Sequence, residues 1–346
     1  MKIFLDDSQC REQLFPFTHT RHVADIRIGI LTIREKWEKL TGKSIFTSKE
    51  DKDDTSLVIS ANIIPTPDNY QAILGNRNDI TTGESIDIKI LGYPWHIFQY
   101  NDWALRQDFE LLTKNKISRP LSKTNQCINE ADIFIGEDAV VEHCIINASA
   151  GPVYIDKHVN IMEGNMIRGP FAICEGAVLK MGSKVYGATT IGPYCTAGGE
   201  IKNSVMFGYS NKAHDGYLGD SVIGEWCNLG AGSSNSNIKN TAGEVRYKTH
   251  DKMDAIVAGN KAGLLMGDYS RAAINTSFNT GSVVGVCCNI FDRNFPAKYV
   301  ANFSWGNERY DLEKAIKDID NWKKMKGKTI TETEKKLLHQ LYTSTL

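Results

Sequence analysis

The sequence predicts a β-solenoid of stacked six-residue repeats, preceded by a small α/β domain and followed by C-terminal helices. The main observation is an aliphatic residue at every sixth position in the middle of the chain: Ile155, Ile161, Ile167, Ile173, Leu179, Val185 and Ile191. An amphipathic helix repeats at three and four positions and a strand at two, so neither explains a period of six. This period is typical of a hexapeptide β-helix, in which three hexads form one coil of a triangular prism. The second observation is that the segments before and after show no such period.

Small residues such as Ala177 tend to stand four positions after each aliphatic residue, where the backbone bends at a corner of the prism. The phase is interrupted over residues 198–211 and 233–261, and it returns with Val284 and Ile290. We interpret both interruptions as loops that leave the wall of the solenoid. Such loops often carry functional residues.

Residues 1–126 form the predicted α/β domain. "MKIFL" and "SLVISANIIP" have the apolar composition of short buried strands. "DIRIGILTIREKWEKL" predicts an amphipathic helix that ends at Gly42. Its apolar face comprises Ile26, Ile30, Ile33 and Trp37.

A second helix is predicted for "NDWALRQDFELLTK", with Ala104, Phe109 and Leu112 facing inward, and it links the first domain to the solenoid of residues 127–305. Residues 306–346 form the predicted helical tail, in which Gly327 separates "DLEKAIKDIDNWKKM" from "TETEKKLLHQLY". We expect these helices to cap or brace the exposed end of the solenoid, since an open coil leaves unpaired strand edges.

The composition favours a cytoplasmic protein. The 346 residues carry a formal net charge of -1, so no global charge attracts nucleic acid or an anionic membrane. No apolar run approaches the roughly 20 residues that span a bilayer, and the start "MKIFLDDSQC" lacks the apolar core of a signal peptide. The eight cysteines show no CxxC pair, which suits reduced thiols packed as small hydrophobic residues.

One segment carries a specific motif. "KNSVMFGYSNKAHDGYLGDSVIGEWCNLGAG" has the pattern K-x11-H-x2-Y-L-G-D-x7-N-x-G-A-G. Together with the hexads, it resembles the acetyltransferase half of bifunctional N-acetylglucosamine-1-phosphate uridyltransferase/glucosamine-1-phosphate acetyltransferase. "HTRHVADIRIGILTIREKWE" and "AINTSFNTGSVVGVCCNIF" extend the resemblance to a Bacteroidetes-type variant with a shortened, divergent nucleotidyltransferase-like first domain. The resemblance implies a left-handed parallel β-helix, a homotrimer, and acetyl-CoA and a sugar phosphate as substrates.

The resemblance also implies roles for individual residues. His214 matches the general base and Glu200 the acid that holds it. Lys202 and Tyr217 match groups that bind the sugar phosphate. The remaining matches are Asn228 and Asn237 in the amino-sugar and acetyl-CoA site, Ala231 as a backbone contact to the cofactor, and, more loosely, Arg246 and Lys248 at the phosphate.

This sequence departs from the family at two positions. "ICEGAVLK" stands where the family has an R-P-G-A arginine, for which Arg168 is a candidate substitute. Ile274 replaces a serine that contacts acetyl-CoA.

These residue types suit acetyl transfer to an amine. A sugar amine is largely protonated near neutral pH, and an imidazole with a pKa of about 6.5 accepts the proton that must leave. A carboxylate such as Glu200 fixes the imidazole tautomer. Backbone N–H groups and an asparagine amide stabilise the oxyanion of the tetrahedral intermediate, and Lys202, Tyr217 and Arg246 offer cations and a hydroxyl to a phosphate dianion.

The first domain suggests a second activity. Sugar nucleotidyltransferases begin with a strand and a glycine-rich loop that ends in Thr-Arg and wraps the nucleotide phosphates. Here the glycines are missing, and Arg21, after Thr20, is the best candidate for binding a nucleoside triphosphate, with Mg²⁺ required if this activity is present. Arg34 and Lys36 are either further phosphate-binding cations or polar-face residues of a helix, and we favour the second for Lys36.

Other interpretations remain open. Taken alone, His214 could be a surface histidine on a loop, and Tyr217 could pack against the wall. Asn228 and Asn237 could be structural residues of tight turns, and Lys202 and Arg246 could be solvated charges. A zinc hydratase on the same fold needs three converging histidines, for which His143, His158 and His214 are the candidates without suitable spacing. A fourth possibility is a non-catalytic scaffold that only assembles trimers.

Overall fold

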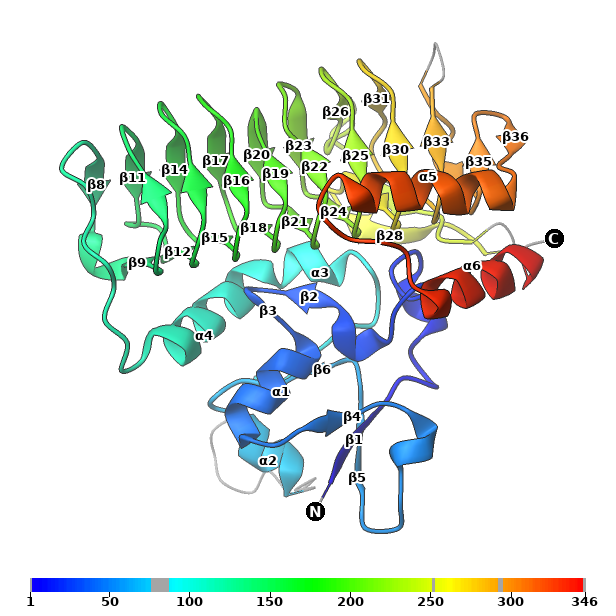
Figure 1. Cartoon of the computed structure of the whole chain (residues 1–346), viewed down its shortest axis with the longest axis horizontal. Coiled ribbons are helices and arrows are strands. Elements are labelled where there is room, and N and C mark those ends of the chain that lie inside the picture. Colours follow the sequence, from blue (N-terminus) through cyan, green and yellow to red (C-terminus); the bar gives the residue numbers. More distant parts are fainter. Residues whose placement is uncertain (1, 76–86, 251–252, 292–294, 345–346) are drawn as a thin grey trace.

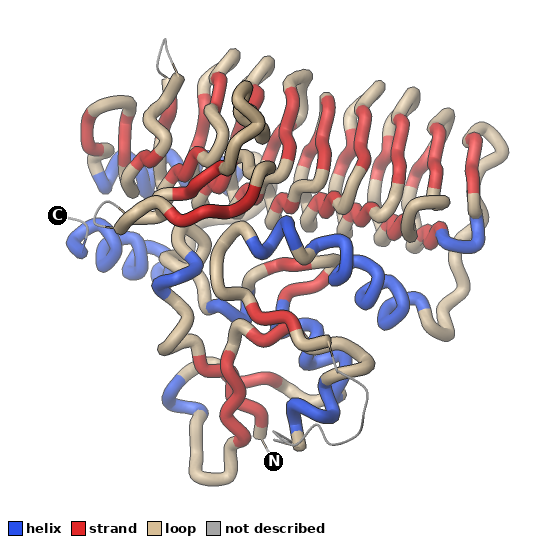
Figure 2. Tube along the Cα trace, turned by 180° about the vertical axis from the view of Figure 1, so that it is seen from behind, coloured by secondary structure: helices blue, strands red, loops and turns tan. Residues whose placement is uncertain are grey.

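The computed structural model describes residues 2–75, 87–250, 253–291 and 295–344. A long solenoid runs along the molecule, and the first region packs below it through α4 (Asn101–Thr113) (Figure 1). Seen from behind, one coil of strands follows another along the same axis (Figure 2). The predicted order of α/β region, parallel β-solenoid and C-terminal helices is confirmed.

Three parallel sheets form the walls of the solenoid over the described residues. The six-stranded wall comprises β8 (Gln126–Ile128), β11 (Ile145–Asn147), β14 (Met166–Arg168), β17 (Lys184–Tyr186), β20 (Glu200–Lys202) and β23 (Tyr217–Gly219). The nine-stranded wall comprises β9 (Ile133–Ile135), β12 (Val153–Ile155), β15 (Phe171–Ile173), β18 (Thr189–Ile191), β21 (Val205–Met206), β24 (Val222–Ile223), β29 (Leu264–Met266), β32 (Ser282–Val284) and β34 (Tyr299–Val300). The ten-stranded wall comprises β10 (Val140–Val141), β13 (Asn160–Ile161), β16 (Val178–Leu179), β19 (Thr196–Ala197), β22 (Asn211–Lys212), β25 (Asn228–Leu229), β30 (Arg271–Ala272), β33 (Asn289–Ile290), β35 (Ser304–Trp305) and β36 (Glu308–Arg309), the last pair being antiparallel.

The hexad aliphatics point into the prism, as predicted. All seven are buried and belong to one hydrophobic core that runs the length of the solenoid. Since each aliphatic residue stacks on its equivalent one coil away, the apolar contacts are continuous from β9 to β33.

The two interruptions of the repeat have different causes. Ile173 pairs with Ile191, 18 positions along the chain, whereas Ile191 pairs with Met206 only 15 positions along. The first interruption is therefore a shortened coil, and the prediction of a loop there is wrong. The second is a true insertion, because Ile223 pairs with Met266 and the intervening chain forms the hairpin of β27 (Val245–Tyr247) and β28 (Ile256–Gly259). A short pair, β26 (Ser234–Asn235) and β31 (Ser277–Phe278), accompanies it.

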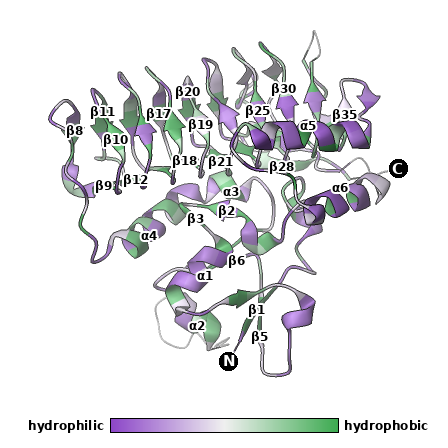
Figure 3. Ribbon diagram, viewed as in Figure 1, coloured by the Kyte–Doolittle hydropathy of each residue, from purple (hydrophilic) through white to green (hydrophobic). Residues whose placement is uncertain are grey.

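In the first region, the strands predicted near the N-terminus form a small parallel sheet. Apolar β1 (Ile3–Asp6, Figure 3) lies between β4 (Ile45–Phe46) and β5 (Leu57–Ser60). An antiparallel pair, β6 (Ile63–Ile64) and β7 (Lys89–Ile90), and the short helices α2 (Tyr70–Leu74) and α3 (His96–Gln99) complete the region, with 3₁₀ turns at Glu12–Leu14, Val23–Asp25 and Lys49–Asp51.

The first predicted helix is shorter than expected. Residues 27–32 form a hairpin of β2 (Arg27–Ile28) and β3 (Leu31–Thr32), and α1 begins only at Ile33 and runs to Thr41. Gly29 has a φ of 71°, and the N–H groups of Gly29 and Ile30 are bound by the distant Asn101 and Asp108, which holds the hairpin. Thr32 and Glu35 then form a capping box that starts the helix. The predicted end at Gly42 is confirmed, with this residue in the left-handed region.

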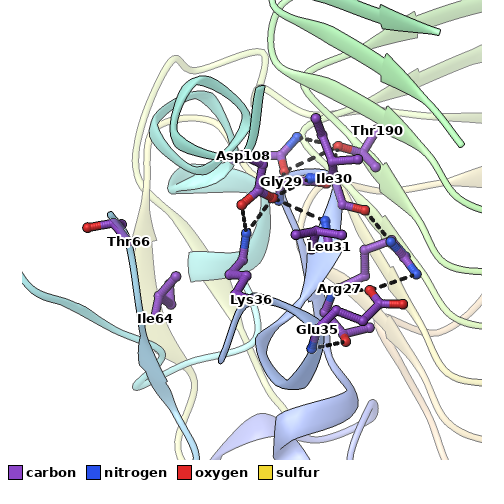
Figure 4. Close-up of polar contacts among 12 residues, drawn as sticks. Arg27, Gly29, Ile30, Leu31, Glu35, Lys36, Ile64, Thr66, Asp108 and Thr190 are labelled. Carbon is purple, nitrogen blue, oxygen red and sulfur yellow. Dashed lines mark hydrogen bonds and ion pairs between the residues drawn. The ribbon is translucent and has the colours of Figure 1, made fainter. Parts of the chain in front are cut away.

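The first region and the solenoid share one core. Its cluster includes Ile3, Trp37 and Phe98 together with Val205 and Leu265 of the nine-stranded wall. Polar contacts reinforce the junction (Figure 4): the buried carboxylate of Asp108 in α4 accepts bonds from the ammonium of Lys36 and the backbone N–H groups of Ile30 (2.7 Å) and Leu31 (3.1 Å). The amide of Asn101, at the start of α4, accepts a hydrogen bond from the backbone N–H of Gly29 and donates one to the carbonyl of Ala188 in the solenoid. The hydrophobic core of the first region therefore continues onto the outer face of the nine-stranded wall.

The C-terminal helices α5 (Leu312–Lys324) and α6 (Glu332–Ser344) brace the flank of the later coils rather than cap the last one (Figure 1). Tyr194, Tyr209 and Trp226 stack along one edge of the solenoid, with ring centroids 5.1 Å and 4.3 Å apart. The ammonium of Lys323 lies 5.1 Å from the ring of Trp226, and that of Lys328 lies 5.9 Å from the ring of Tyr209. Cation–π contacts therefore fasten the tail to the edge.

All eight cysteines are free thiols, and every one except half-buried Cys127 is buried. In the part of the chain that the structure describes, no helix has the length and apolar character needed to cross a membrane.

Candidate active site

Four of the predicted site residues lie on the outer face of the six-stranded wall. In β17, β20 and β23 the central residue points into the core, so the flanking residues point outward. Strand register places Lys184, Glu200 and Tyr217 in one outward row, and Tyr186, Lys202 and Gly219 in the next. Arg168 lies on β14, one coil before Tyr186, and both side chains line the same cavity. The structure thus brings Glu200, Lys202, Tyr217 and Arg168 to one surface.

Tyr186, which the sequence interpretation missed, connects this group. Its hydroxyl donates a hydrogen bond of 2.6 Å to the carboxylate of Glu200, and this bond raises the pKa of Tyr186 to about 12. The ammonium of Lys202 lies 5.8 Å from the centroid of the same ring. Tyr186 and Arg168 also line a shallow cavity of about 410 Å³.

Tyr217 is held by a polar network. Its hydroxyl accepts a hydrogen bond of 3.0 Å from the amide of Asn237, which also donates to buried Asp220. Asp220 in turn accepts from Asn203 (2.6 Å). Burial raises the pKa of Tyr217 above its usual range, so its hydroxyl stays protonated at neutral pH.

Gly219 explains why the Tyr217 ring can lie against the wall. A Cβ at position 219 would stand 2.2 Å from the Tyr217 hydroxyl oxygen and 2.4 Å from the ring. Both residues point outward from β23, so the ring fills the space that a side chain at 219 would occupy. The "YLGD" sequence therefore has a packing function.

His214 is exposed on the bend between β22 and β23, at the edge where the ten-stranded and six-stranded walls meet. Ala231 lies on the same edge one coil later: Gly232 N–H donates to the carbonyl of Asp215 (3.0 Å). Exposed Ile274 follows, where Asn275 N–H donates to the carbonyl of Ala231 (2.7 Å). Successive coils thus align His214, Ala231 and Ile274.

Asn228 and Glu200, the other two predicted catalytic residues, form no hydrogen bond or ion pair with the imidazole of His214 in the part of the chain that the structure describes. Asn228 lies on β25 of the ten-stranded wall and pairs with Asn211, three residues before His214. Among the contacts of the described residues, none joins the imidazole to Glu200, whose carboxylate is engaged by Tyr186.

Arg246 and Lys248 lie on or next to the inserted hairpin. Its buried Tyr247 stacks on Trp95 of the first region, with ring centroids 5.3 Å apart. Arg246 is exposed and 3.8 Å from Glu244, and the Lys248 ammonium is 6.0 Å from the centroid of Tyr299. No contact within the described ranges joins Arg246 to Lys202 or Tyr217.

Arg21 is largely buried where the first region meets the solenoid, with 9% of its side chain exposed. Its guanidinium pairs with Asp268 and, at 3.3 Å, with Glu225, and it lies 4.9 Å from the ring of Phe207. It lines a cavity of about 500 Å³ with Thr20 and Glu334.

The interpretation of Lys36 as a solvated polar-face residue is wrong, because its side chain is 1% exposed and pairs with buried Asp108. Arg34 is engaged by Asp25, with Nε 2.6 Å from the carboxylate.

The structure brings no group of three histidine, cysteine or acidic side chains together as metal ligands anywhere in its described residues, His143, His158 and His214 included. A zinc hydratase site therefore has no ligand set in this part of the chain.

Residues 2–86 match the sugar nucleotidyl transferase family. The chain is 33% identical over 89 residues to the bifunctional protein GlmU of Methanocaldococcus jannaschii, covering 26% of this chain and 21% of that protein. It is 29% identical over 203 residues to the bifunctional sugar-1-phosphate nucleotidylyltransferase/acetyltransferase of Sulfurisphaera tokodaii, covering 58% of this chain and 44% of that protein. It is 26% identical over 198 residues to the bifunctional protein GlmU of Desulfitobacterium hafniense, covering 57% of this chain and 37% of that protein.

The chain spans less than half the length of each of these relatives. Together with the β-solenoid, these similarities support an enzyme of the transferase type related to sugar nucleotidyltransferase/acetyltransferases. The closer likeness to a Bacteroidetes-type variant, the domain boundaries and the cytoplasmic location stay predictions.

Proposed function

We propose that the chain is an acetyl-CoA-dependent N-acetyltransferase that acts on an amino-sugar phosphate, with His214 as general base. The observation that carries the proposal is the arrangement on the solenoid: an exposed imidazole at an edge, next to a wall that presents Lys202, Tyr217 and Arg168. The similarity to a bifunctional nucleotidylyltransferase/acetyltransferase supports the same reaction class.

In the proposed reaction, the sugar amine attacks the carbonyl carbon of the thioester. His214 takes a proton from the nitrogen as the C–N bond forms. The C–S bond then breaks, and the imidazolium returns this proton to the leaving sulfur, so that coenzyme A departs as a thiol. The imidazole of His214 is exposed, so a bound substrate can reach it for this proton transfer. The amide of Asn228 and backbone N–H groups near Ala231 are the proposed donors to the oxyanion, and each would lower the activation barrier by about 3 kcal/mol.

The sugar phosphate is proposed to bind on the six-stranded wall. Lys202 supplies a cation, and the protonated hydroxyl of Tyr217 supplies a donor once it turns from its neighbours to the phosphate. Asn237, held by Asp220, completes this group. Arg168 is the proposed second cation, because it lies on the same wall two coils before Lys202, with Tyr186 on the coil between them. The geometry supports Arg246 and Lys248 less well, since they belong to the hairpin region.

A homotrimer is part of the proposal. His214 and Ala231 lie on an exposed edge, where a second copy of the chain can close the groove over acetyl-CoA. Sedimentation of the purified chain should give a trimer, and a monomer that is fully active would contradict this part of the proposal.

The test is thiol release from acetyl-CoA in the presence of glucosamine-1-phosphate and other amino-sugar phosphates. We expect release to require the amine, so the matched N-acetylated sugar phosphate serves as the control. Thiol release that is equally fast with the N-acetylated sugar would contradict amine acetylation.

A second candidate function is sugar-phosphate nucleotidyl transfer by the first region, favoured by the family match of residues 2–86. Arg21 would contact a nucleoside triphosphate in the cavity that it lines, although Asp268 and Glu225 already neutralise its charge. The test is pyrophosphate release from UTP or dTTP with a sugar phosphate, with and without magnesium.

A further inference from the structure

Lys212 occupies an unusual position inside the solenoid. It stands on β22 at the inward position of the ten-stranded wall, paired with Ala197, in the column that contains Ile161 and Leu179. Its side chain is 1% exposed. The small side chain of Ala197 leaves room in this column that the aliphatic stem of the lysine can fill.

Burying an ammonium group is costly unless it is hydrogen-bonded. Among the ion pairs of the described residues, none involves Lys212, whose ammonium is hydrogen-bonded to backbone carbonyls. Burial lowers the pKa of Lys212 to about 8, with Asp215 acting in the opposite direction. An aliphatic residue, as elsewhere in the column, would fill the space without this cost. The specific contribution of the lysine is therefore its donor group.

The ammonium donates to two backbone carbonyls at the same edge of the prism. One is the carbonyl of Gly198, at 3.2 Å, and the other is the carbonyl of His214 itself. Because these carbonyls belong to successive coils, the lysine ties the bend that carries the imidazole to the coil below.

The coil below is shaped to receive this bend. It is the shortened coil, and its edge consists of Gly198 and Gly199. A Cβ at 198 would stand 2.5 Å from the carbonyl oxygen of Ala213, and one at 199 would stand 2.8 Å from that of His214. The bend therefore rests directly on the two glycines, while the ammonium holds it from inside.

We propose that Lys212 is a positioning residue for the proposed acetyl transfer: from the interior of the solenoid it fixes the backbone of His214, and so the direction in which the imidazole projects. The catalytic part of this inference rests on the proposed function, whereas the contact between Lys212 and the backbone of His214 is present in the chain without substrate. Without the donor, the bend would keep its packing on Gly198 and Gly199 and lose its tie to the core.

The experiment compares Lys212→Met, which keeps the stem and removes the donor, with the wild type and with Ile161→Ala as a control. Ile161 lies in the same column three coils away, so its truncation weakens the core without touching the bend. Amide hydrogen exchange is followed in residues 213–217. In Lys212→Met we expect exchange there to accelerate by roughly 10- to 100-fold, the change for losing a hydrogen bond from a charged donor. In Ile161→Ala it should change no more than in the rest of the solenoid.

Acetyl transfer gives the second readout. Lys212→Met should lower kcat while leaving the KM for acetyl-CoA nearly unchanged, because the imidazole rather than the cofactor contacts is displaced. Unchanged exchange at 213–217 in a folded Lys212→Met chain would overturn the inference and make Lys212 a core residue only.

If Lys212→Met does not fold, the wild type decides. Lysine ¹³Cε NMR should show one side chain that titrates near pH 8 together with the amide signals of 213–216, where His214 and Asp215 are the other titratable groups. A titration of Lys212 near 10.5 without such coupling would overturn the inference. If the wild type shows no acetyl transfer at all, the proposed function fails, while the exchange and titration results still decide whether Lys212 holds the bend.

Discussion

Replacing Gly219 by alanine places a methyl group where the Tyr217 side chain now lies. The added Cβ would stand 2.2 Å from the Tyr217 hydroxyl oxygen and 2.4 Å from the ring, far inside van der Waals contact. The ring is half-buried, so it can swing toward solvent rather than force the wall apart. We therefore expect Gly219→Ala to fold with a loss of stability of only about 1 kcal/mol, at the lower end of the range for overpacking.

The effect on function should be larger. A displaced Tyr217 loses its bond to Asn237 and no longer offers its hydroxyl to the phosphate. A hydrogen bond to a charged group is worth about 1.5–3 kcal/mol, which corresponds to roughly 10- to 150-fold in affinity. We predict an increase of this size in the KM for the sugar phosphate, with little change in the KM for acetyl-CoA.

The assay is steady-state thiol release for four chains: wild type, Gly219→Ala, Tyr217→Phe and the double variant. Tyr217→Phe should raise the KM by a similar factor, and the double variant should add little, since both changes remove the same hydroxyl. Gly208→Ala is the matched control, because a Cβ there meets nothing closer than 3.5 Å. An unchanged KM in Gly219→Ala, or fully additive effects, would refute the role of the "YLGD" packing.

Three further predictions concern other residues. His214→Ala should lower kcat by about 10²- to 10⁴-fold without a change in Tm, because the side chain is exposed; a kcat within twofold of the wild type would exclude His214 as the base. Burial lowers the pKa of His19 to about 4, so the native state resists its protonation, and stability should fall by up to about 3 kcal/mol as the pH drops from 6.5 to 4. In urea unfolding, the stability of His19→Leu should depend less on pH between 6.5 and 4 than that of the wild type. An identical pH dependence would show that His19 is not its cause. Lys36→Met leaves Asp108 buried and unpaired and should cost about 3–5 kcal/mol. Adding Asp108→Asn should recover most of this loss in thermal unfolding, and no recovery would show that the charge is not the cause.

The sequence predicted the fold well wherever one local rule decides the structure. Hexad spacing alone placed Ile155 to Ile191 in the core, because each rung repeats the environment of the last. The helix end at Gly42 followed from the same kind of local signal. The start of that helix did not, because the N–H groups of Gly29 and Ile30 are satisfied by Asn101 and Asp108, more than 70 residues away.

The candidate site was predictable in part for the same reason. Glu200, Lys202 and Tyr217 share a wall because strand alternation and coil stacking place them there. Tyr186 was missed because its register with Lys202 depends on the shortened coil, which the sequence did not distinguish from a loop. Lys212 had a signal that could have been used: a lysine in a column otherwise filled by Leu179 and Ala197.

The most direct test of the central claim is the fate of an isotopically labelled acetyl group. Acetyl-CoA with a deuterated acetyl group is incubated with glucosamine-1-phosphate and the wild-type chain, and the products are analysed by mass spectrometry. The account predicts that the label appears on the sugar nitrogen, and that the folded His214→Ala chain forms this product about 10²- to 10⁴-fold more slowly. Label found only in free acetate or in unreacted acetyl-CoA, or an undiminished product from His214→Ala, would contradict it.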